Sequence, residues 1–86
     1  MVKVDHTKSP NGWVNIYFNG ILHLSIYGPS VIKVQTWLSH SPIWKKYTKY
    51  YIEITHKSGV IDGSDYTCRE TWKRVANVIS QTITNY

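Results

Sequence analysis

The chain has 86 residues, of which 42% are hydrophobic and 17% charged. This length suits one domain with one core, and the hydrophobic share argues against an intrinsically disordered chain. No apolar run approaches the roughly 20 residues of a membrane span, and the first residues lack the apolar segment of a secretory signal. A single cysteine, Cys68, excludes an internal disulfide. We therefore expect a protein without a membrane partner in the cytoplasm of a cell or an infected host.

Charge and aromatic content narrow the classes of partner. The formal net charge is +5, and the chain carries four Trp, seven Tyr and one Phe. A moderate positive charge attracts a polyanion without requiring one. Aromatic rings stack on nucleic-acid bases, and Tyr and Trp are also enriched at protein interfaces. Nucleic acid and protein therefore both remain candidate partners.

Residues 1–12 are expected to form an N-terminal arm or a short edge strand, separate from a single domain over 13–86. Val2 and Val4 favour a short strand. The segment ends in the turn-rich run from Lys8 to Gly12, which excludes a central strand because proline cannot donate to a sheet.

Residues 13–27 have the pattern of a β-hairpin, with Asn19-Gly20 as the turn. A two-residue loop pairs Phe18 with Ile21 and sends the apolar residues of the two strands to opposite faces. A three-residue loop with a bulge at Gly20 keeps them on one face, so this register is expected. The predicted apolar face holds Val14, Ile16, Leu22, Leu24 and Ile26, and the opposite face Asn15, Tyr17, His23, Ser25 and Tyr27.

Two helices are predicted, separated by a second hairpin. The first begins at Gly28-Pro29-Ser30, carries apolar residues at helical spacing, and ends before Pro42. Residues 49–57 alternate as a strand, Val60 and Ile61 form a short return strand, and residues 62–65 form a loop. The second helix follows a capping box of Thr67 and Glu70. Its buried face is expected to hold Cys68, Trp72, Val75, Ala76, Ile79 and Ile83, and its exposed side Arg69, Lys73, Arg74, Asn77 and Gln81.

The predicted fold is therefore an α+β two-layer sandwich of order ββαββα. An antiparallel sheet of four to five strands has two helices on one face. Its other face is left free for base stacking or for sheet-to-sheet dimerisation. That free face is predicted to hold Tyr17, His23, Tyr27, Lys49, Tyr51 and Lys57.

The run from Trp44 to Lys57 interleaves lysines with aromatic rings, a pattern that suits phosphate contact and base stacking. It predicts a small RNA-binding protein with weak sequence specificity. A binder of single-stranded DNA is the less favoured alternative. Tyr17 and Tyr27 are secondary stacking candidates. The predicted binding residues are Trp44, Lys45, Lys46, Tyr47, Lys49, Tyr51, Lys57, Arg69, Lys73 and Arg74.

No catalytic site, metal or cofactor is expected. The four histidines lack zinc-site spacing, and Cys68 has no sulfur partner. Two alternatives remain open. One is an inhibitor or adaptor that binds a protein, such as a viral antagonist of a host defence enzyme or toxin. The other is a small toxin-type ribonuclease using His23 or His56 with Glu53. A homodimer is expected in either binding role.

Overall fold

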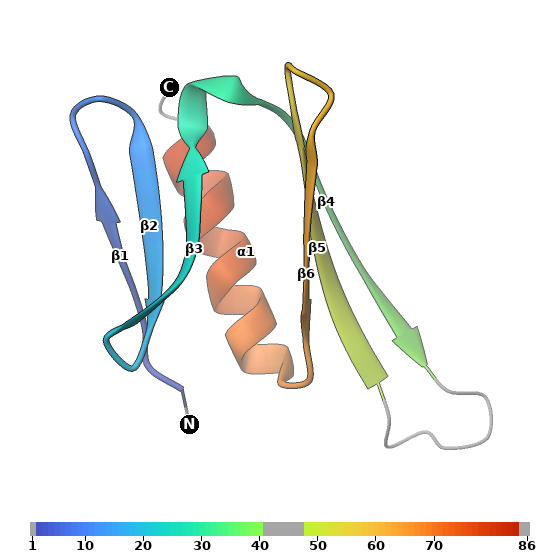
Figure 1. Ribbon diagram of the computed structural model, residues 1–86. Coiled ribbons are helices and arrows are strands. Elements are labelled where there is room, and N and C mark those ends of the chain that lie inside the picture. The colour runs from blue at the N-terminus through green and yellow to red at the C-terminus, as the bar shows by residue number, and fades with distance from the viewer. Residues whose placement is uncertain (1, 41–47, 85–86) are drawn as a thin grey trace.

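The computed structural model describes residues 2–40 and 48–84 and shows six strands, a short 3₁₀ turn and one helix (Figure 1). In chain order these are β1 (Val4–Lys8), β2 (Trp13–Phe18), β3 (Ile21–Tyr27), η1 (Gly28–Ser30), β4 (Val31–His40), β5 (Thr48–His56), β6 (Ile61–Tyr66) and α1 (Arg69–Thr84).

The strands form two antiparallel sheets of three strands each, ordered β1-β2-β3 and β4-β5-β6. The sequence-based prediction of one sheet of four to five strands with two helices, in order ββαββα, is wrong. The α+β composition remains, with one helix in the described residues. The segment before Pro10 forms β1, the edge strand of the first sheet, paired with β2.

The β2–β3 hairpin places its bulge in the strand and not in the loop. Asn19 and Gly20 both have positive φ, 51° and 82°, as a two-residue hairpin loop requires. Phe18 accordingly pairs with Ile21, and the register then shifts so that Ile16 pairs with Leu24. The predicted three-residue loop is therefore wrong. The shift still brings most apolar residues of the two strands onto one face, but Leu22 is exposed.

The predicted first helix is wrong, because residues 31–40 form the long strand β4. Three β-branched residues, Val31, Ile32 and Val34, begin this segment, and such residues favour strands. A short apolar run with helical spacing does not distinguish helix from strand, so pairing with β5 decides the outcome. Val34 lies opposite Ile54, and Trp37 lies opposite Tyr51.

The predicted loop at residues 62–65 is also wrong, since it belongs to strand β6. Asp62 pairs with Ile54 and Asp65 with Tyr51, so this polar segment continues the second sheet. Asp and Gly are depleted in strands, and the pairing with β5 overrides that local preference. The predicted turn at residues 57–59 does join β5 to β6, with Gly59 at φ +90°.

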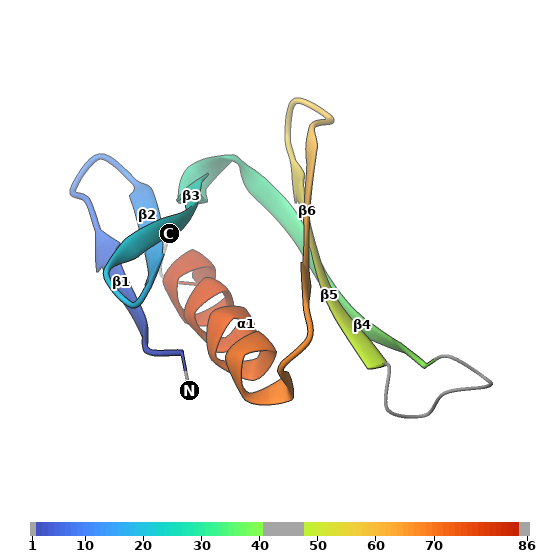
Figure 2. The ribbon, with the colours of Figure 1, turned by 60° about the horizontal axis from the view of Figure 1, so that its bottom comes forward.

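Helix α1 packs in the angle between the two sheets (Figure 2). Val75 and Ile79 of the helix are buried, and Arg69, Lys73, Arg74, Asn77 and Gln81 are exposed, as predicted. Cys68 is exposed and precedes the first helical residue, so its predicted burial is wrong. The side chain of Ile83, also predicted to be buried, lies outside the described part of the structure. The core combines both sheets with the helix and consists of Val14, Ile16, Ile26, Ile52, Ile54, Tyr66, Val75 and Ile79.

Because the strands form two sheets, the predicted helix-free face does not exist as one surface. Tyr17 and Tyr27 belong to the first sheet, and Lys49 and Tyr51 belong to the second. His23 leaves that face altogether, since its Nε2 lies 2.9 Å from the hydroxyl of Tyr66 on β6. Lys57 lies in the turn after β5.

Candidate functional site

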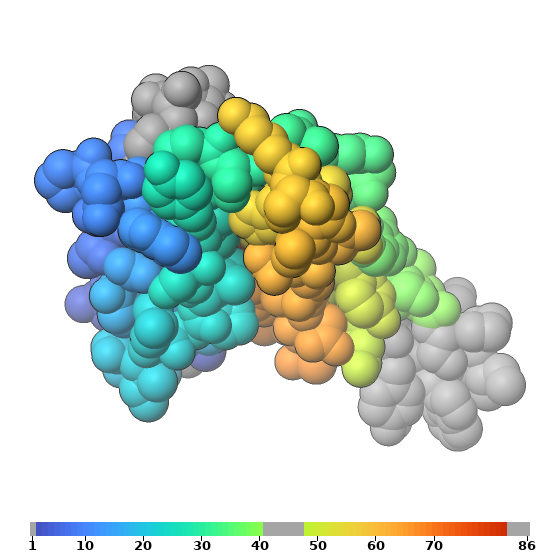
Figure 3. Space-filling view, turned by 45° about the horizontal axis from the view of Figure 1, so that its top comes forward, coloured from blue at the N-terminus to red at the C-terminus, as the bar shows by residue number. Residues whose placement is uncertain are grey.

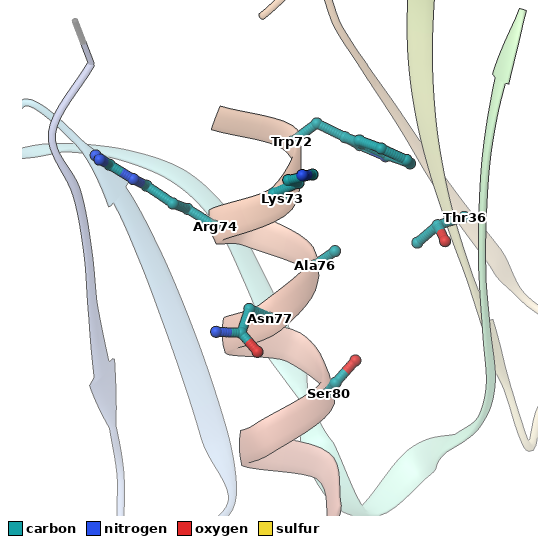
Figure 4. Close-up of a pocket in the computed structure, with 7 residues that line it drawn as sticks. All are labelled: Thr36, Trp72, Lys73, Arg74, Ala76, Asn77 and Ser80. Carbon is teal, nitrogen blue, oxygen red and sulfur yellow. The ribbon is translucent and has the colours of Figure 1, made fainter. Parts of the chain in front are cut away.

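A groove runs between helix α1 and strand β4 (Figure 4). Its volume is 530 Å³, and it is lined by Thr36, Trp72, Lys73, Arg74, Ala76, Asn77 and Ser80. The lining contains two cations and no acidic side chain, so it favours an anionic ligand. Lys73 and Arg74 were predicted from the sequence as phosphate contacts.

Trp72 forms a fixed wall of the groove. Its indole Nε1 donates a hydrogen bond of 3.0 Å to the backbone oxygen of Tyr51. Its ring lies 5.0 Å from that of Tyr50, centroid to centroid. In Figure 4 the indole extends from α1 toward the second sheet, whereas Arg74 extends in the opposite direction, toward the strands of the first sheet. The groove therefore has a held aromatic ring on its second-sheet side, whereas Arg74 borders it from the side of α1 that faces the first sheet.

Trp72 was predicted only as a buried core residue, and its place in this groove was not predicted from the sequence. Trp72 is only half-buried because the groove separates α1 from β4 at this point. No signal in the sequence indicates that gap, because residues 31–40 were expected to form a helix and not the facing strand.

A pair of stacked rings and a second hollow lie on the outer face of the second sheet, which is turned away from α1. Trp37 and Tyr51 stack there with centroids 5.3 Å apart and planes at 16°. Beside them is a hollow of 270 Å³, lined by Trp37, Tyr51, Ile52, Glu53, Gly63, Ser64 and Asp65. Lys49 reaches Asp65 at 3.5 Å. The two carboxylates repel phosphate, so the predicted base stacking on Tyr51 lies in an unfavourable electrostatic setting.

The predicted binding residues in the described part of the chain therefore do not form one surface. Lys73 and Arg74 both line the groove, and Arg69 is exposed one turn before Lys73 on the same helix. Lys49 and Tyr51 lie on β5, and Lys57 is exposed in the β5–β6 turn. Trp44, Lys45, Lys46 and Tyr47 lie outside the described residues. Of the secondary candidates, Tyr27 contacts Trp13 at 5.4 Å between ring centroids, and Tyr17 is half-buried.

A second cluster, which the sequence analysis missed, joins Ser30, His56 and Asp62. His56 Nδ1 lies 2.6 Å from Ser30 Oγ, and His56 Nε2 lies 2.7 Å from Asp62 Oδ2. The Ser30 hydroxyl also donates to the backbone oxygen of Tyr27 at 2.8 Å. These residues come from η1, the end of β5 and the start of β6. No sequence motif indicates the cluster, because the spacing between them carries no signature and Asp62 was expected in a loop.

The pKa values of His23 and Cys68 are both lowered. Burial lowers the pKa of His23, which favours its neutral form. The pKa of the Cys68 thiol is lowered because Thr71 donates hydrogen bonds to it from its backbone and side chain, and Glu70 donates one from its backbone.

The residues expected for a nuclease, His23 or His56 with Glu53, do not contact one another in the interactions that the structure shows. His23 contacts Tyr66, His56 contacts Ser30 and Asp62, and Glu53 lines the hollow on the outer face.

Within residues 2–40 and 48–84, no group of three or more His, Cys, Asp or Glu side chains is placed to hold a metal ion. Over the same residues, α1 lacks the length and apolar character needed to cross a membrane.

The sequence matches no protein-family model, no curated protein and no solved structure at a significant level.

Proposed function

We propose that this protein binds single-stranded nucleic acid, RNA in preference to DNA, in the groove between α1 and β4. The observation that carries the proposal is the lining of that groove, which combines Lys73 and Arg74 with the ring of Trp72 and contains no carboxylate. Cations attract the phosphate backbone, and an aromatic ring supplies a stacking surface for a base. The site binds without catalysis, and its sequence specificity is weak because charge and stacking read little base identity.

We propose different tasks for the groove residues. Consecutive residues of a helix point in different directions, so Lys73 and Arg74, which are both exposed, contact phosphates at separate points of the bound strand. Arg69, one turn earlier, extends the positive side of α1 toward its N-terminus. Asn77 also lines the groove and supplies an amide that donates to or accepts from a base edge.

Binding is measured by fluorescence anisotropy of a labelled oligouridylate and a labelled oligothymidylate of equal length over a salt series. Three phosphate contacts, from Arg69, Lys73 and Arg74, predict a slope of log K against log salt of about −2 for a single strand. Each charge removed reduces the steepness of this slope by roughly one unit at most. Tighter binding of the uridylate supports the preference for RNA.

The variant Lys73→Glu tests the location, and Lys33→Glu is its matched control. Both lysines are exposed, and Lys33 lies on β4 outside the groove lining. The two variants change the net charge of the protein equally, so any loss of non-specific attraction to the oligonucleotide affects both. We expect Lys73→Glu to weaken binding by at least about tenfold and Lys33→Glu by much less. Equal losses, or no binding by the wild type at low salt, would refute the proposal.

A protein partner is the second candidate, favoured by β4. Among the described strands β4 pairs only with β5, and it exposes Ile32, Trp37 and Leu38. A long strand edge with apolar residues is a template for pairing with another chain. We propose a homodimer formed by antiparallel pairing of two β4 edges in the cytoplasm. The same edge is the candidate contact for an inhibitor or adaptor role.

Light scattering coupled to size exclusion tests the dimer. The wild type is expected at twice the chain mass of 10.0 kDa. Ile32→Pro removes a backbone donor from β4 and is expected to give a monomer, provided that circular dichroism shows the fold retained. A monomeric wild type at high concentration contradicts the dimer and leaves β4 for a different protein partner.

A further inference from the structure

The Ser30–His56–Asp62 cluster borders a hollow that is separate from the groove between α1 and β4. The hollow has a volume of 270 Å³ and is lined by Trp13, Ser25, Tyr27, Ser30, His56, Ser58, Val60 and Asp62. It shares no lining residue with the groove. The β5–β6 turn closes against η1, since the backbone nitrogen of Lys57 donates to the Ser30 oxygen at 2.7 Å. Figure 3 shows this turn in yellow against the segment that contains η1.

From these contacts we propose that Ser30, His56 and Asp62 form a nucleophilic site for acyl transfer, with Ser30 as the nucleophile and small carboxylic esters as the substrate class. This goes beyond the proposed nucleic-acid binding and departs from the sequence-based expectation of no catalytic site. The proposal follows from three features together, namely a hydroxyl in contact with an imidazole, a carboxylate on the other imidazole nitrogen, and a hollow bordered by all three.

The hydrogen bonds assign the role of each atom. The Ser30 hydroxyl has one hydrogen and two neighbours that accept it, the Tyr27 backbone oxygen and His56 Nδ1. When the hydrogen turns to Nδ1, the imidazole is the base for Oγ. Its Nε2–H then donates to Asp62, which fixes this tautomer. The carboxylate also stabilises the imidazolium that forms when the proton is transferred.

Burial holds this arrangement in place. His56 is only 9% exposed, whereas the Asp62 side chain is 46% exposed. A buried imidazole needs a partner for each ring nitrogen, and both partners are present. The ring is thereby held in one orientation, as a base needs. Ser30 is half-buried and lines the hollow.

The reaction balances without a further reactant except water. Ser30 Oγ forms a bond to the ester carbonyl carbon while its proton moves to His56 Nδ1, and the carbonyl electron pair moves to oxygen. Collapse of this intermediate breaks the carbon–oxygen bond to the alcohol, which leaves with the proton from His56. Water then attacks the acyl-Ser30 by the same route and releases the acid.

The walls of the hollow define the substrate class. Trp13 and Tyr27 lie side by side on β2 and β3, with ring centroids 5.4 Å apart and planes at 49°. Val60 adds an aliphatic surface, and the charge among the lining residues is limited to His56 and Asp62. The site therefore favours a small uncharged ester with a flat apolar group, because rings contact such a group without displacing a hydrogen bond.

The test uses a biotin-linked fluorophosphonate, which reports an activated serine irrespective of the natural ester. Ser30 Oγ forms a bond to phosphorus, fluoride leaves, and the proton moves to His56. The full chain is incubated at neutral pH, and intact mass with peptide mapping follows the adduct. We expect one adduct, on Ser30, that is absent from heat-unfolded protein.

Two variants separate catalysis from structural support. Asp62→Asn keeps the size of the side chain but removes its charge, and should slow labelling at least about tenfold. Ser39→Ala changes an exposed serine on β4 that does not line the hollow and should label at the wild-type rate. Ser30→Ala should show no adduct, and if it does not fold, the mapped wild-type adduct decides. An unlabelled wild type, an adduct on another residue, or an Asp62→Asn protein that labels at the wild-type rate overturns the proposal.

Discussion

The imidazole of His23 on β3 lies 2.9 Å from the hydroxyl of Tyr66 on β6, so one side-chain hydrogen bond joins the two sheets. The Tyr66 hydroxyl donates to Ser64 Oγ at 3.0 Å and therefore accepts from His23 Nε2–H. Phe18 stacks on the imidazole with a centroid distance of 4.0 Å. The contact leaves His23 partly desolvated, which disfavours its charged form.

This contact predicts a loss of stability in acid. Burial lowers the pKa of His23 in the folded state below its ordinary value of 6.5. Below pH 6.5 the unfolded chain binds the proton more readily, so the free energy of unfolding falls as the pH falls from 6.5 to the folded-state pKa. Urea unfolding of His23→Gln should show a weaker pH dependence than the wild type over that window. His6→Gln on the exposed strand β1 is the matched control, and an unchanged profile in His23→Gln would contradict the assignment.

Gly12 is predicted to be less replaceable than Gly59. Its φ is +100°, and an added Cβ would lie 2.9 Å from Pro29 Cδ and 3.1 Å from the Tyr27 ring. Gly59 also has positive φ, +90°, but has open space around the added atom. We expect Gly59→Ala to cost about 1 kcal/mol from backbone strain alone. Gly12→Ala should cost about 2–4 kcal/mol, since overpacking adds to that strain. Thermal unfolding of both variants measures the difference, and equal costs would show that Pro29 yields.

The shared core predicts that both sheets unfold together. Ile16 on β2 and Ile79 on α1 are fully buried in one cluster with residues of β5 and β6. Truncation of either to Ala should cost about 2–5 kcal/mol. Ile21→Ala, at a position that is 74% exposed, should cost less than about 0.5 kcal/mol. Urea unfolding followed by tryptophan fluorescence and by circular dichroism should give one transition for Ile16→Ala. Two separated transitions would show that the sheets fold independently.

The acidic hollow on the outer face of the second sheet gives a test of where a nucleic acid lies. Glu53 and Asp65 border the hollow beside the Trp37–Tyr51 stack. If the strand occupies the groove on the other side of the sheet, Glu53→Gln combined with Asp65→Asn should change its affinity less than about threefold. Lys73→Gln should weaken binding in the same anisotropy assay. A large gain in affinity on removing the two carboxylates would instead place the ligand against Tyr51.

The candidate site was predictable in part. The spacing of Lys73 and Arg74 on an amphipathic pattern indicated exposed cations on a helix, and the structure places them so. It did not indicate the strand that faces them. Helical spacing of Val31, Val34 and Leu38 is also compatible with a strand, and pairing with β5 decided between the two. The Ser30–His56–Asp62 cluster was beyond prediction, because it depends on how η1 meets the β5–β6 hairpin.

The sequence by itself determined what is local. The alternation in residues 49–57 predicted a strand, the periodicity after Cys68 predicted a helix with its polar face outward, and Asn19-Gly20 predicted a hairpin turn. Only the tertiary structure decided the identity of residues 31–40, the pairing of Asp62–Asp65 and the split into two sheets. The physical reason is that strand pairing and hollows between elements depend on partners distant in the chain, whereas helical periodicity and turn chemistry depend on neighbours.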